Sequence, residues 1–326
     1  MRIVFHGENA ASFSNDFGRL VEETEDIRIL PDLLTNPADQ EAYARAETII
    51  GARFARDLPQ PESLQLFHVP GAGYDAVDLA AIPGSAVVCN CFGHEQAIAE
   101  YVMAALLARH VPLADADQKL RQGNWAYSSG SLARLHDELA EKTIGLLGYG
   151  HIGKAIAMRA KAFEMKVHVA NRSAVAPSSI VDRSFTLNNL HEFWASADFF
   201  VVSVPLIAET TGIVDAKAFA AMRPTAVVLN VGRGPTIDER SLYDALKDGR
   251  IAGAIIDTWY NYPTPEQPNI LPSAFSFHTL PNVVMTPHMS GWTSGTIRRR
   301  QQTMAENIRR RFDGRACINV VRPALL

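Results

Sequence analysis

The chain has 326 residues, 47% of them hydrophobic, which is enough for two domains of ordinary size and excludes a disordered protein. Its 31 lysines and arginines against 35 aspartates and glutamates give a formal charge of -4, so nucleic acid and an anionic membrane are not expected partners. The three cysteines have neither metal-binding nor thioredoxin spacing, which predicts buried free thiols in a reducing compartment, the cytoplasm. Arg2 to Phe5 indicates a strand rather than a secretion signal.

The first ninety residues alternate short apolar runs with more polar stretches, a pattern that predicts parallel βαβ units. The apolar runs lie at residues 3–5, 27–30, 48–50, 66–69 and 86–89. From His94 to Arg109 the apolar residues recur at helical spacing, which indicates a long helix leaving the first unit. Its apolar stretch, residues 101–108, is far shorter than the ~20 residues of a membrane span.

After a turn at residues 123–125, uninterrupted apolar strands alternate with helices, which predicts a sheet covered on both faces. These strands are expected at residues 144–147, 167–170, 199–202, 226–229, 254–256 and 283–285. A helix from about Thr293 to Phe312 closes the chain. Its arginine triplets, residues 298–300 and 309–311, are interpreted as a solvated face, since no aromatic side chains interleave for stacking on bases.

A glycine-rich loop, Gly148-Tyr149-Gly150-His151-Ile152-Gly153, follows the strand at residues 143–147 and leads into a helix. Gly148 permits the tight turn, Gly150 lets a pyrophosphate approach the backbone, and Gly153 lets helix and strand pack closely. The free N–H groups at the start of the helix attract phosphate. Because strand, loop and helix occur in this order, the segment predicts a dinucleotide site.

The next strand ends at Asn171-Arg172-Ser173, where such folds select between NAD and NADP. An NAD site usually has an acidic residue at this point. Asn171 has no charge to repel a 2′-phosphate and Arg172 can pair with one, which favours NADP. Stacking of Arg172 on adenine, as in some NAD enzymes, is the alternative.

Two further segments lie after strands whose carboxyl ends bind ligands in open α/β sheets: residues 229–235, with Arg233, and residues 286–291, with His288. An arginine between glycines suits a planar carboxylate, which it holds by two parallel hydrogen bonds. The imidazole of His288 suits proton donation to an oxygen that gains charge during reduction.

The segments GYGHIG, NVGRG, GAIID and TPHMSG stand in the order found in D-isomer-specific 2-hydroxyacid dehydrogenases, and the chain resembles that family over nearly its whole length. The resemblance implies that Arg233 binds the substrate carboxylate, that His288 is the acid/base, and that Asp257 holds the nicotinamide carboxamide. It also implies that backbone N–H groups near Ala72 and Gly73 cradle the carboxylate. Further residues expected at the cofactor are Tyr149, His151, Ile152, Ser173, Val204, Pro205, Val231 and Gly232.

The chain departs from the family at two positions. The glutamate that most members pair with the histidine is Tyr262 here, and the asparagine ahead of Ala99-Glu100 is His94. Tyr262 and His94 are therefore candidates for reading the substrate, with helix capping as the alternative for His94. Without a charged partner, His288 is expected near its ordinary pKa of ~6.5, so that reduction weakens as pH rises through roughly 6–7. Glu266 is the nearby carboxylate that could replace the missing partner, and we expect that it does not.

Together these features predict two doubly wound α/β domains with parallel sheets: a Rossmann cofactor domain, residues 96–290, inserted in a flavodoxin-like substrate domain, residues 1–95 and 291–326. The active site is expected in the cleft, without a metal. The expected reaction is hydride transfer between NADP, or NAD, and a 2-oxo or 2-hydroxy acid. Alternatives are a dinucleotide-sensing module like the family's corepressors, and oxidation of a small acid as in formate dehydrogenases. The resemblance further implies a homodimer formed through the helices between His94 and Trp125.

Overall fold

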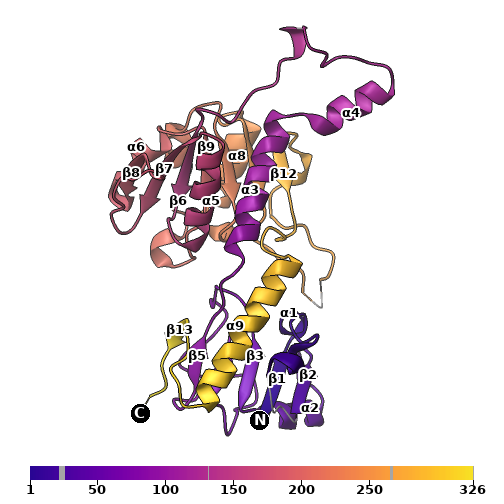
Figure 1. Ribbon diagram of the computed structural model, residues 1–326, viewed down its shortest axis with the longest axis vertical. Coiled ribbons are helices and arrows are strands. Elements are labelled where there is room, and N and C mark those ends of the chain that lie inside the picture. The colour runs from indigo at the N-terminus through magenta and orange to yellow at the C-terminus, as the bar shows by residue number, and fades with distance from the viewer. Residues whose placement is uncertain (22–25, 131, 265–266, 326) are drawn as a thin grey trace. The chain divides into compact units, whose positions relative to one another are not determined.

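The computed structural model describes residues 1–21, 26–130, 132–264 and 267–325 (Figure 1). The chain forms two units, the first made of residues 1–93 and 293–326 and the second of residues 94–292. The second unit is thus inserted between the two segments of the first.

The first unit contains a six-stranded sheet in the order β13-β5-β4-β3-β1-β2. Its strands are β1 (Arg2–His6), β2 (Asp26–Leu30), β3 (Thr48–Gly51), β4 (Leu66–His68), β5 (Val87–Cys89) and β13 (Val320–Arg322). Its helices are α1 (Glu8–Ala11), α2 (Pro37–Ala44) and α9 (Ser294–Phe312), with a 3-10 turn η1 (Phe17–Leu20). The pairs among β1 to β5 are parallel, and their order is that of flavodoxin-like folds.

The second unit contains a seven-stranded parallel sheet in the order β12-β11-β10-β9-β6-β7-β8. Its strands are β6 (Thr143–Leu147), β7 (Lys166–Asn171), β8 (Arg183–Thr186), β9 (Phe199–Val202), β10 (Val227–Asn230), β11 (Gly253–Ile256) and β12 (Val283–Met285). Its helices are α3 (Glu95–His110), α4 (Leu113–Arg121), α5 (His151–Ala162), α6 (Leu190–Trp194), α7 (Ala216–Ala221) and α8 (Glu239–Lys247). Short 3-10 turns are η2 (Leu132–Arg134), η3 (Leu187–Asn189), η4 (Ala208–Thr210), η5 (Gly234–Thr236) and η6 (Phe277–Thr279).

The strand order of the second unit reverses between β6 and β9, which is the ligand-binding switch point of a Rossmann fold. Apolar clusters cover both faces of this sheet. On one face α3 packs beside α5, and Val102 and Ile156 join the strands (Figure 1). On the other, Phe193 and Phe200 pack edge to face. The predicted α/β class with two parallel sheets is confirmed.

The structure corrects the expected strands at the sheet edges. The sequence pattern missed β8 and β13, and β13 pairs antiparallel with β5, so the first sheet is not wholly parallel. The pattern also treated Val283 to Met285 as a covered strand. Val284 is exposed, so β12, at the edge of the sheet, is not covered on both faces.

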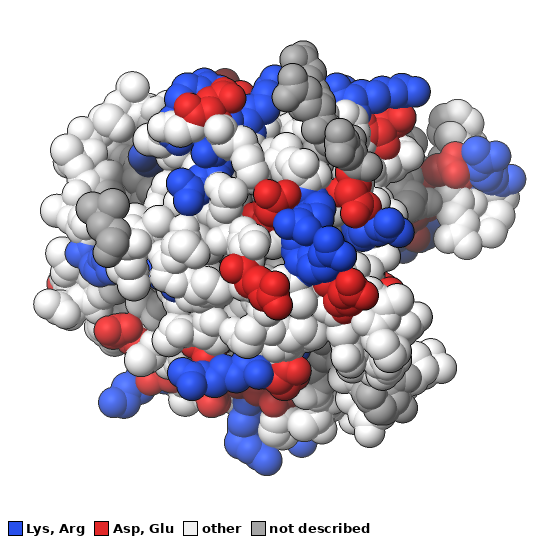
Figure 2. All heavy atoms as spheres, turned by 90° about the horizontal axis from the view of Figure 1, so that it is seen from below, with Lys and Arg blue, Asp and Glu red and all other residues white. Residues whose placement is uncertain are grey.

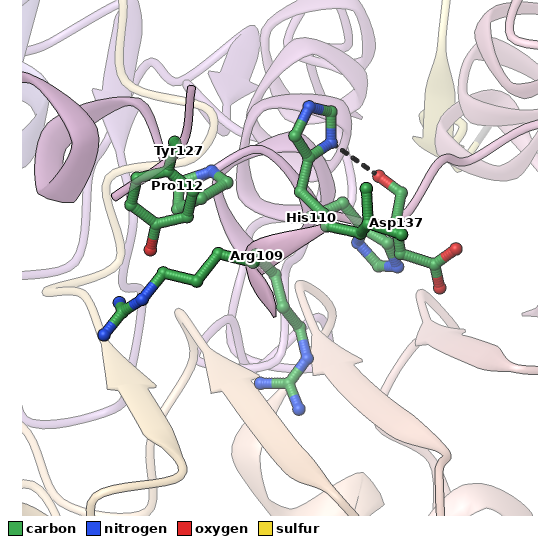
Figure 3. A pocket seen from close by; sticks show the side chains of 8 residues that line it. Arg109, His110, Pro112, Tyr127 and Asp137 are labelled. Carbon is green, nitrogen blue, oxygen red and sulfur yellow. Dashed lines mark hydrogen bonds between the residues drawn. The ribbon is translucent and has the colours of Figure 1, made fainter. Parts of the chain in front are cut away.

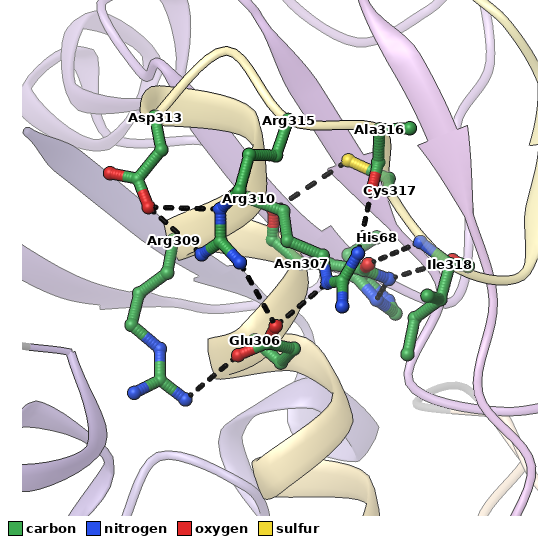
Figure 4. Close-up of polar contacts among 10 residues, drawn as sticks. All are labelled: His68, Glu306, Asn307, Arg309, Arg310, Asp313, Arg315, Ala316, Cys317 and Ile318. Atoms are coloured by element: carbon green, nitrogen blue, oxygen red, sulfur yellow. Dashed lines mark hydrogen bonds and ion pairs between the residues drawn. The ribbon is translucent and has the colours of Figure 1, made fainter.

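The interpretation of the α9 arginines as a solvated face is wrong for four of the six. Arg298 and Arg309 are exposed, whereas the half-buried arginines are Arg299, Arg300, Arg310 and Arg311. Arg310 pairs with Glu306 at 2.7 Å (Figure 4), and Arg311 donates to the backbone carbonyls of Gln65 and Ser85. Arg311 therefore holds α9 against its own unit, whereas the pair of Arg310 and Glu306 lies within the helix. On the face drawn in Figure 2, basic and acidic side chains are mixed.

All three cysteines are free, as predicted, and Cys89 and Cys91 are buried while Cys317 is half-buried. Among the described residues no single helix is long and apolar enough to cross a membrane, and α3 with α4 passes that test only as a pair bent by 48°.

Candidate active site

The glycine-rich loop joins β6 to α5 and has the geometry that a bound pyrophosphate needs. Gly148 has φ +101°, a conformation that favours glycine, and its N–H donates to the carbonyl of Ala170 at 2.8 Å. A Cβ on Gly153 would lie 2.2 Å from the carbonyl oxygen of Gly148, so a larger residue would push the helix off the strand. A Cβ on Gly150 would meet no described atom within 4 Å. This open space above the start of α5, which no side chain caps, fits a phosphate group.

Asn171, Arg172 and Ser173 lie beside this loop at the end of β7. The side-chain oxygen of Asn171 accepts from the backbone N–H of Tyr149 at 3.3 Å, and its amide nitrogen donates to the carbonyl of Ser173 at 3.1 Å. Asn171 thus ties the glycine-rich loop to residues 171–173, the segment expected to select between NAD and NADP and called the selector segment below. Arg172 is exposed, and within the described ranges it makes no hydrogen bond or ion pair.

The other residues expected at the cofactor lie at the ends of β9 and β10. Val204 is buried, whereas Pro205 is exposed and its carbonyl accepts from the hydroxyl of Thr210 at 2.6 Å. Val231 is buried, and a Cβ on Gly232 would lie 3.0 Å from the carbonyl oxygen of Val204. The segments after β9 and β10 therefore approach each other closely beside the switch point. In the loop, His151 and Ile152 form the first turn of α5.

Arg233 is half-buried immediately after β10. Its carbonyl accepts from the side-chain amide of Asn230 at 3.1 Å and from the hydroxyl of Thr236 at 2.6 Å. Its guanidinium donates to the carbonyl of Gly232 at 2.9 Å. Backbone contacts thus fix the segment, and the planar fork of a guanidinium is a shape that suits a planar anion.

His288 lies in a loop that the buried carboxylate of Asp257 holds. Asp257, at the end of β11, is fully buried and accepts from the hydroxyl of Thr286 at 2.6 Å and from the N–H groups of Met289 and Ser290 at 2.8 and 3.0 Å. His288 has φ +58°, a left-handed conformation that is uncommon for residues with a Cβ. The three hydrogen bonds stabilise the loop in this conformation.

The side chain of His288 has a partner that the sequence did not predict. The hydroxyl of Tyr262 lies 2.9 Å from His288 Nδ1 and accepts from the backbone N–H of Trp259 at 3.1 Å. Burial raises the pKa of Tyr262, although the Trp259 N–H and Arg233 oppose the shift. At neutral pH the phenol is therefore uncharged and keeps its proton. Pro265 and Glu266, the alternative partner considered from the sequence, lie outside the described residues.

Three substrate-binding candidates lie in different settings. His94 is the residue before α3; its side chain makes no capping hydrogen bond, and Nδ1 lies 3.8 Å from the Glu95 carboxylate. Ala72 and Gly73 belong to the first unit, where the carbonyl of Ala72 accepts from the side chain of Asn90 at 2.8 Å. Within the second unit the structure brings Tyr262 to His288 and Asp257 to the His288 loop.

Sequence reasoning missed Tyr101 on α3. Because the Asp257 carboxylate only accepts, the Thr286 hydroxyl donates to it, and the Tyr101 hydroxyl then donates to Thr286 at 2.7 Å. Burial raises the pKa of Tyr101, so the donor stays protonated. A tyrosine among the apolar residues of a helix was the available signal, but its partner is 185 positions away in the sequence.

A cavity of about 400 Å³ lies elsewhere in the second unit, at the carboxyl end of α3 (Figure 3). Its lining residues are Arg109, His110, Pro112, Tyr127, Arg134, Leu135, His136 and Asp137. None of the predicted site residues lines it. Within the described ranges, no cluster of three His, Cys, Asp or Glu side chains is arranged to hold a metal ion.

Residues 103–290 match the family model described as "D-isomer specific 2-hydroxyacid dehydrogenase, NAD binding domain". The glyoxylate reductase of Pyrococcus furiosus is 32% identical over 89% of this chain and 81% of its own. The chain also matches D-3-phosphoglycerate dehydrogenases but spans about half of their length, for example 56% of the one from Methanocaldococcus jannaschii.

Two of the similar solved structures show the likeness over 99% of this chain. An NADPH-dependent glyoxylate/hydroxypyruvate reductase from Sinorhizobium meliloti, in complex with NADP and malonate, has a TM-score of 0.78 and 28% identity over 99% of its own chain. An acyclic imino acid reductase in complex with NADPH and D-Arg has a TM-score of 0.79 and 26% identity over 100% of its chain. The matched family model, the relatives and the fold agree, and the chain belongs to the D-isomer-specific 2-hydroxyacid dehydrogenase family.

Proposed function

We propose that the protein reduces a small 2-oxo acid, with NADPH as the hydride donor. The observation that carries this proposal is the pairing of His288 with Tyr262 on a loop that Asp257 holds, in the unit that also carries the glycine-rich loop and Arg233. The nicotinamide supplies the hydride when the cofactor is bound. The chain's own groups bind the acid, orient it and deliver the proton.

Arg233 and His288 have different roles: one binds the substrate and the other donates the proton. In this proposal the guanidinium of Arg233 holds the carboxylate by two parallel hydrogen bonds, and His288 Nε2 gives its proton to the oxygen that becomes a hydroxyl. Ala72 and Gly73 of the first unit stay proposed carboxylate-binding residues. His94 is proposed to contact the part of the substrate beyond its carboxylate and so to help determine specificity.

The cofactor preference rests on the selector segment. Asn171 carries no charge and is held against the glycine-rich loop, and the exposed guanidinium of Arg172 is available to a 2′-phosphate. Both features favour NADP over NAD. Asp257 accepts from three donors of the His288 loop and is fully buried, so its expected contact with the nicotinamide carboxamide stays a prediction.

Turnover of a substrate panel with NADPH tests the reaction. The acids to be assayed with NADPH are glyoxylate, hydroxypyruvate, pyruvate and larger 2-oxo acids. Formate with NADP tests oxidation of a small acid. Pyruvate with an amine is a further arm because one similar structure is an imino acid reductase. A cofactor-sensing module would bind NADPH and oxidise none with any member of the panel, which would refute the proposed reaction.

Arg233→Lys tests the assigned carboxylate site. The ammonium keeps the charge but cannot make two parallel bonds, so kcat/KM should fall roughly 10- to 100-fold, the loss of one charge-assisted hydrogen bond. The matched control is Arg183→Lys, since Arg183 stacks on the Phe185 ring at 4.9 Å, on β8. Unchanged kcat/KM in Arg233→Lys would remove this residue from the substrate site.

We also propose that two copies of the chain associate through α4 and the segment after it. Large apolar side chains stand exposed there, in the residues Leu113, Leu120, Trp125, Leu132 and Leu135, with exposed fractions of 50–84%. A monomer rarely leaves so many large apolar groups together in water. A cytoplasmic location is consistent with the free thiols and stays a prediction.

A further inference from the structure

Tyr262 takes the position where most family members pair a glutamate with the histidine, and its hydroxyl is held from two sides. The backbone N–H of Trp259 donates to it at 3.1 Å, and His288 Nδ1 lies 2.9 Å away. Trp259 is itself fixed, because its side chain is buried and its indole N–H donates to the carbonyl of Thr286 at 2.8 Å. The hydroxyl is thus positioned by the same segment that carries His288.

The hydrogen-bond partners of the Tyr262 hydroxyl favour the phenol as the donor to His288. An N–H can only donate, so the Trp259 N–H occupies one lone pair of the phenol oxygen. The O–H group of the phenol then needs a hydrogen-bond acceptor. Among the described residues, His288 Nδ1 is the acceptor within hydrogen-bond distance of that O–H. With a neutral imidazole, donation from the phenol to Nδ1 places the imidazole proton on Nε2.

We propose that Tyr262 is a positioning residue that fixes neutral His288 in the tautomer protonated at Nε2. This inference rests on the proposed function, in which Nε2 faces the substrate. A glutamate in the same place has no proton to give at neutral pH, so it accepts from Nδ1–H and leaves a lone pair on Nε2. Tyrosine and glutamate therefore select opposite tautomers of the same histidine.

The tautomer decides which direction of the reaction His288 supports. Reduction adds a hydride to the carbonyl carbon and a proton to its oxygen, and the imidazolium form supplies that proton from Nε2, leaving neutral imidazole. Oxidation of the 2-hydroxy acid reverses both transfers, so it needs a lone pair on Nε2. Neutral His288 held by Tyr262 offers an N–H there instead. The pair therefore favours turnover as a reductase over turnover as a dehydrogenase.

The other charged groups facing Tyr262 do not change this assignment. Arg233 and Asp257 act on its hydroxyl with opposite signs, the cation lowering and the carboxylate raising its pKa, while burial dominates and raises it. The phenol thus stays protonated wherever His288 is neutral at ordinary pH. The tautomer is then set by the hydrogen bond and not by ionisation of the tyrosine.

The test is a long-range ¹H–¹⁵N correlation spectrum of protein labelled at its histidines, recorded without substrate at pH 8, with His288→Gln to assign the signal. We expect His288 to show a protonated Nε2 and an unprotonated Nδ1. Tyr262→Phe should shift the tautomer ratio towards Nδ1–H by about two- to twelvefold, the worth of one hydrogen bond. Tyr262→Glu should invert the preference. Tyr260→Phe is the matched control, because the Tyr260 hydroxyl donates to the carbonyl of Ile237 at 3.1 Å instead.

A protonated Nδ1 in the unmodified protein, or the same spectrum in Tyr262→Phe, would overturn the proposal. If Tyr262→Phe does not fold, the spectrum of the unmodified protein still decides. The kinetic counterpart is the ratio of kcat for oxidation to kcat for reduction at pH 8, which Tyr262→Glu should raise and Tyr260→Phe should leave unchanged. The spectrum needs no substrate, so it separates failure of this proposal from failure of the proposed reaction.

Discussion

Replacing Asp257 by asparagine removes a charge that three donors share. Oδ1 accepts from Thr286 and Met289, and Oδ2 accepts from the N–H of Ser290. In the variant one of the two oxygens becomes an NH2 group. Whichever way the amide is turned, at least one donor then faces another donor, inside a site that solvent does not reach.

The magnitude follows from those contacts. A hydrogen bond to a charged group contributes about 1.5–3 kcal/mol, and a buried N–H left without an acceptor costs about as much again. We therefore expect Asp257→Asn to lower the free energy of unfolding by about 2–4 kcal/mol. For a unit of about 200 residues this corresponds to a fall in Tm of roughly 5–15 °C. The loop would also be freer to release the left-handed conformation of His288, so kcat should fall as well.

The assay is calorimetric unfolding of the cofactor-free protein, with NADPH affinity measured in parallel. Asp244→Asn on the exposed surface of α8 is the matched control and should leave Tm unchanged. A Tm within about 1 °C of the unmodified protein would refute the reasoning, because three hydrogen bonds of this kind should be worth several degrees. If NADPH affinity alone falls, Asp257 serves the cofactor and not the loop.

Four further outcomes are expected. Arg172→Ala should remove most of a preference for NADPH over NADH measured by titration, and equal affinities in the unmodified protein would contradict the NADP assignment. Gly153→Ala should abolish cofactor binding and lower Tm, since the new methyl group would overlap the carbonyl of Gly148. Mass mapping after brief treatment with iodoacetamide at pH 7.5 should find Cys317 labelled before Cys89. The Cys89 thiol and nearby arginines lower the pKa of Cys317 to about 7, whereas the contact with Cys317 and burial raise the pKa of Cys89. Light scattering at micromolar concentration should give twice the monomer mass, and Trp125→Ser should lower it; a monomer in the unmodified protein would reject the proposed dimer.

The sequence was sufficient to predict the structure where a short stretch of residues determines the local conformation. The glycine-rich loop was predicted from residue types alone, since each glycine answers a local requirement of the turn or of the helix packing. The edge strands β8 and β13 were missed because an edge strand buries few side chains and shows no apolar run: in β8 only Phe185 is buried. The contacts of Asp257 and Tyr262 depend on loops that meet only after folding. No local pattern indicates that a tyrosine hydroxyl will reach an imidazole 26 positions away.

Because the second unit is inserted between the two segments of the first, the two units are completed at different times during synthesis. The core of the first unit includes Met304, Ala305 and Ile308 of α9, which pack with Ile3 and Phe5 of β1. Nearly the whole chain must therefore be made before this core can close. At about 5–20 residues per second, the roughly 200 inserted residues take on the order of 10–40 s to translate. Throughout that interval the N-terminal segment has an apolar sheet face that α9 does not yet cover. At the end of the interval the inserted unit has all its strands, while α9 is still to be made. The inserted unit is thus able to fold before the first unit, whose N-terminal segment must wait for α9.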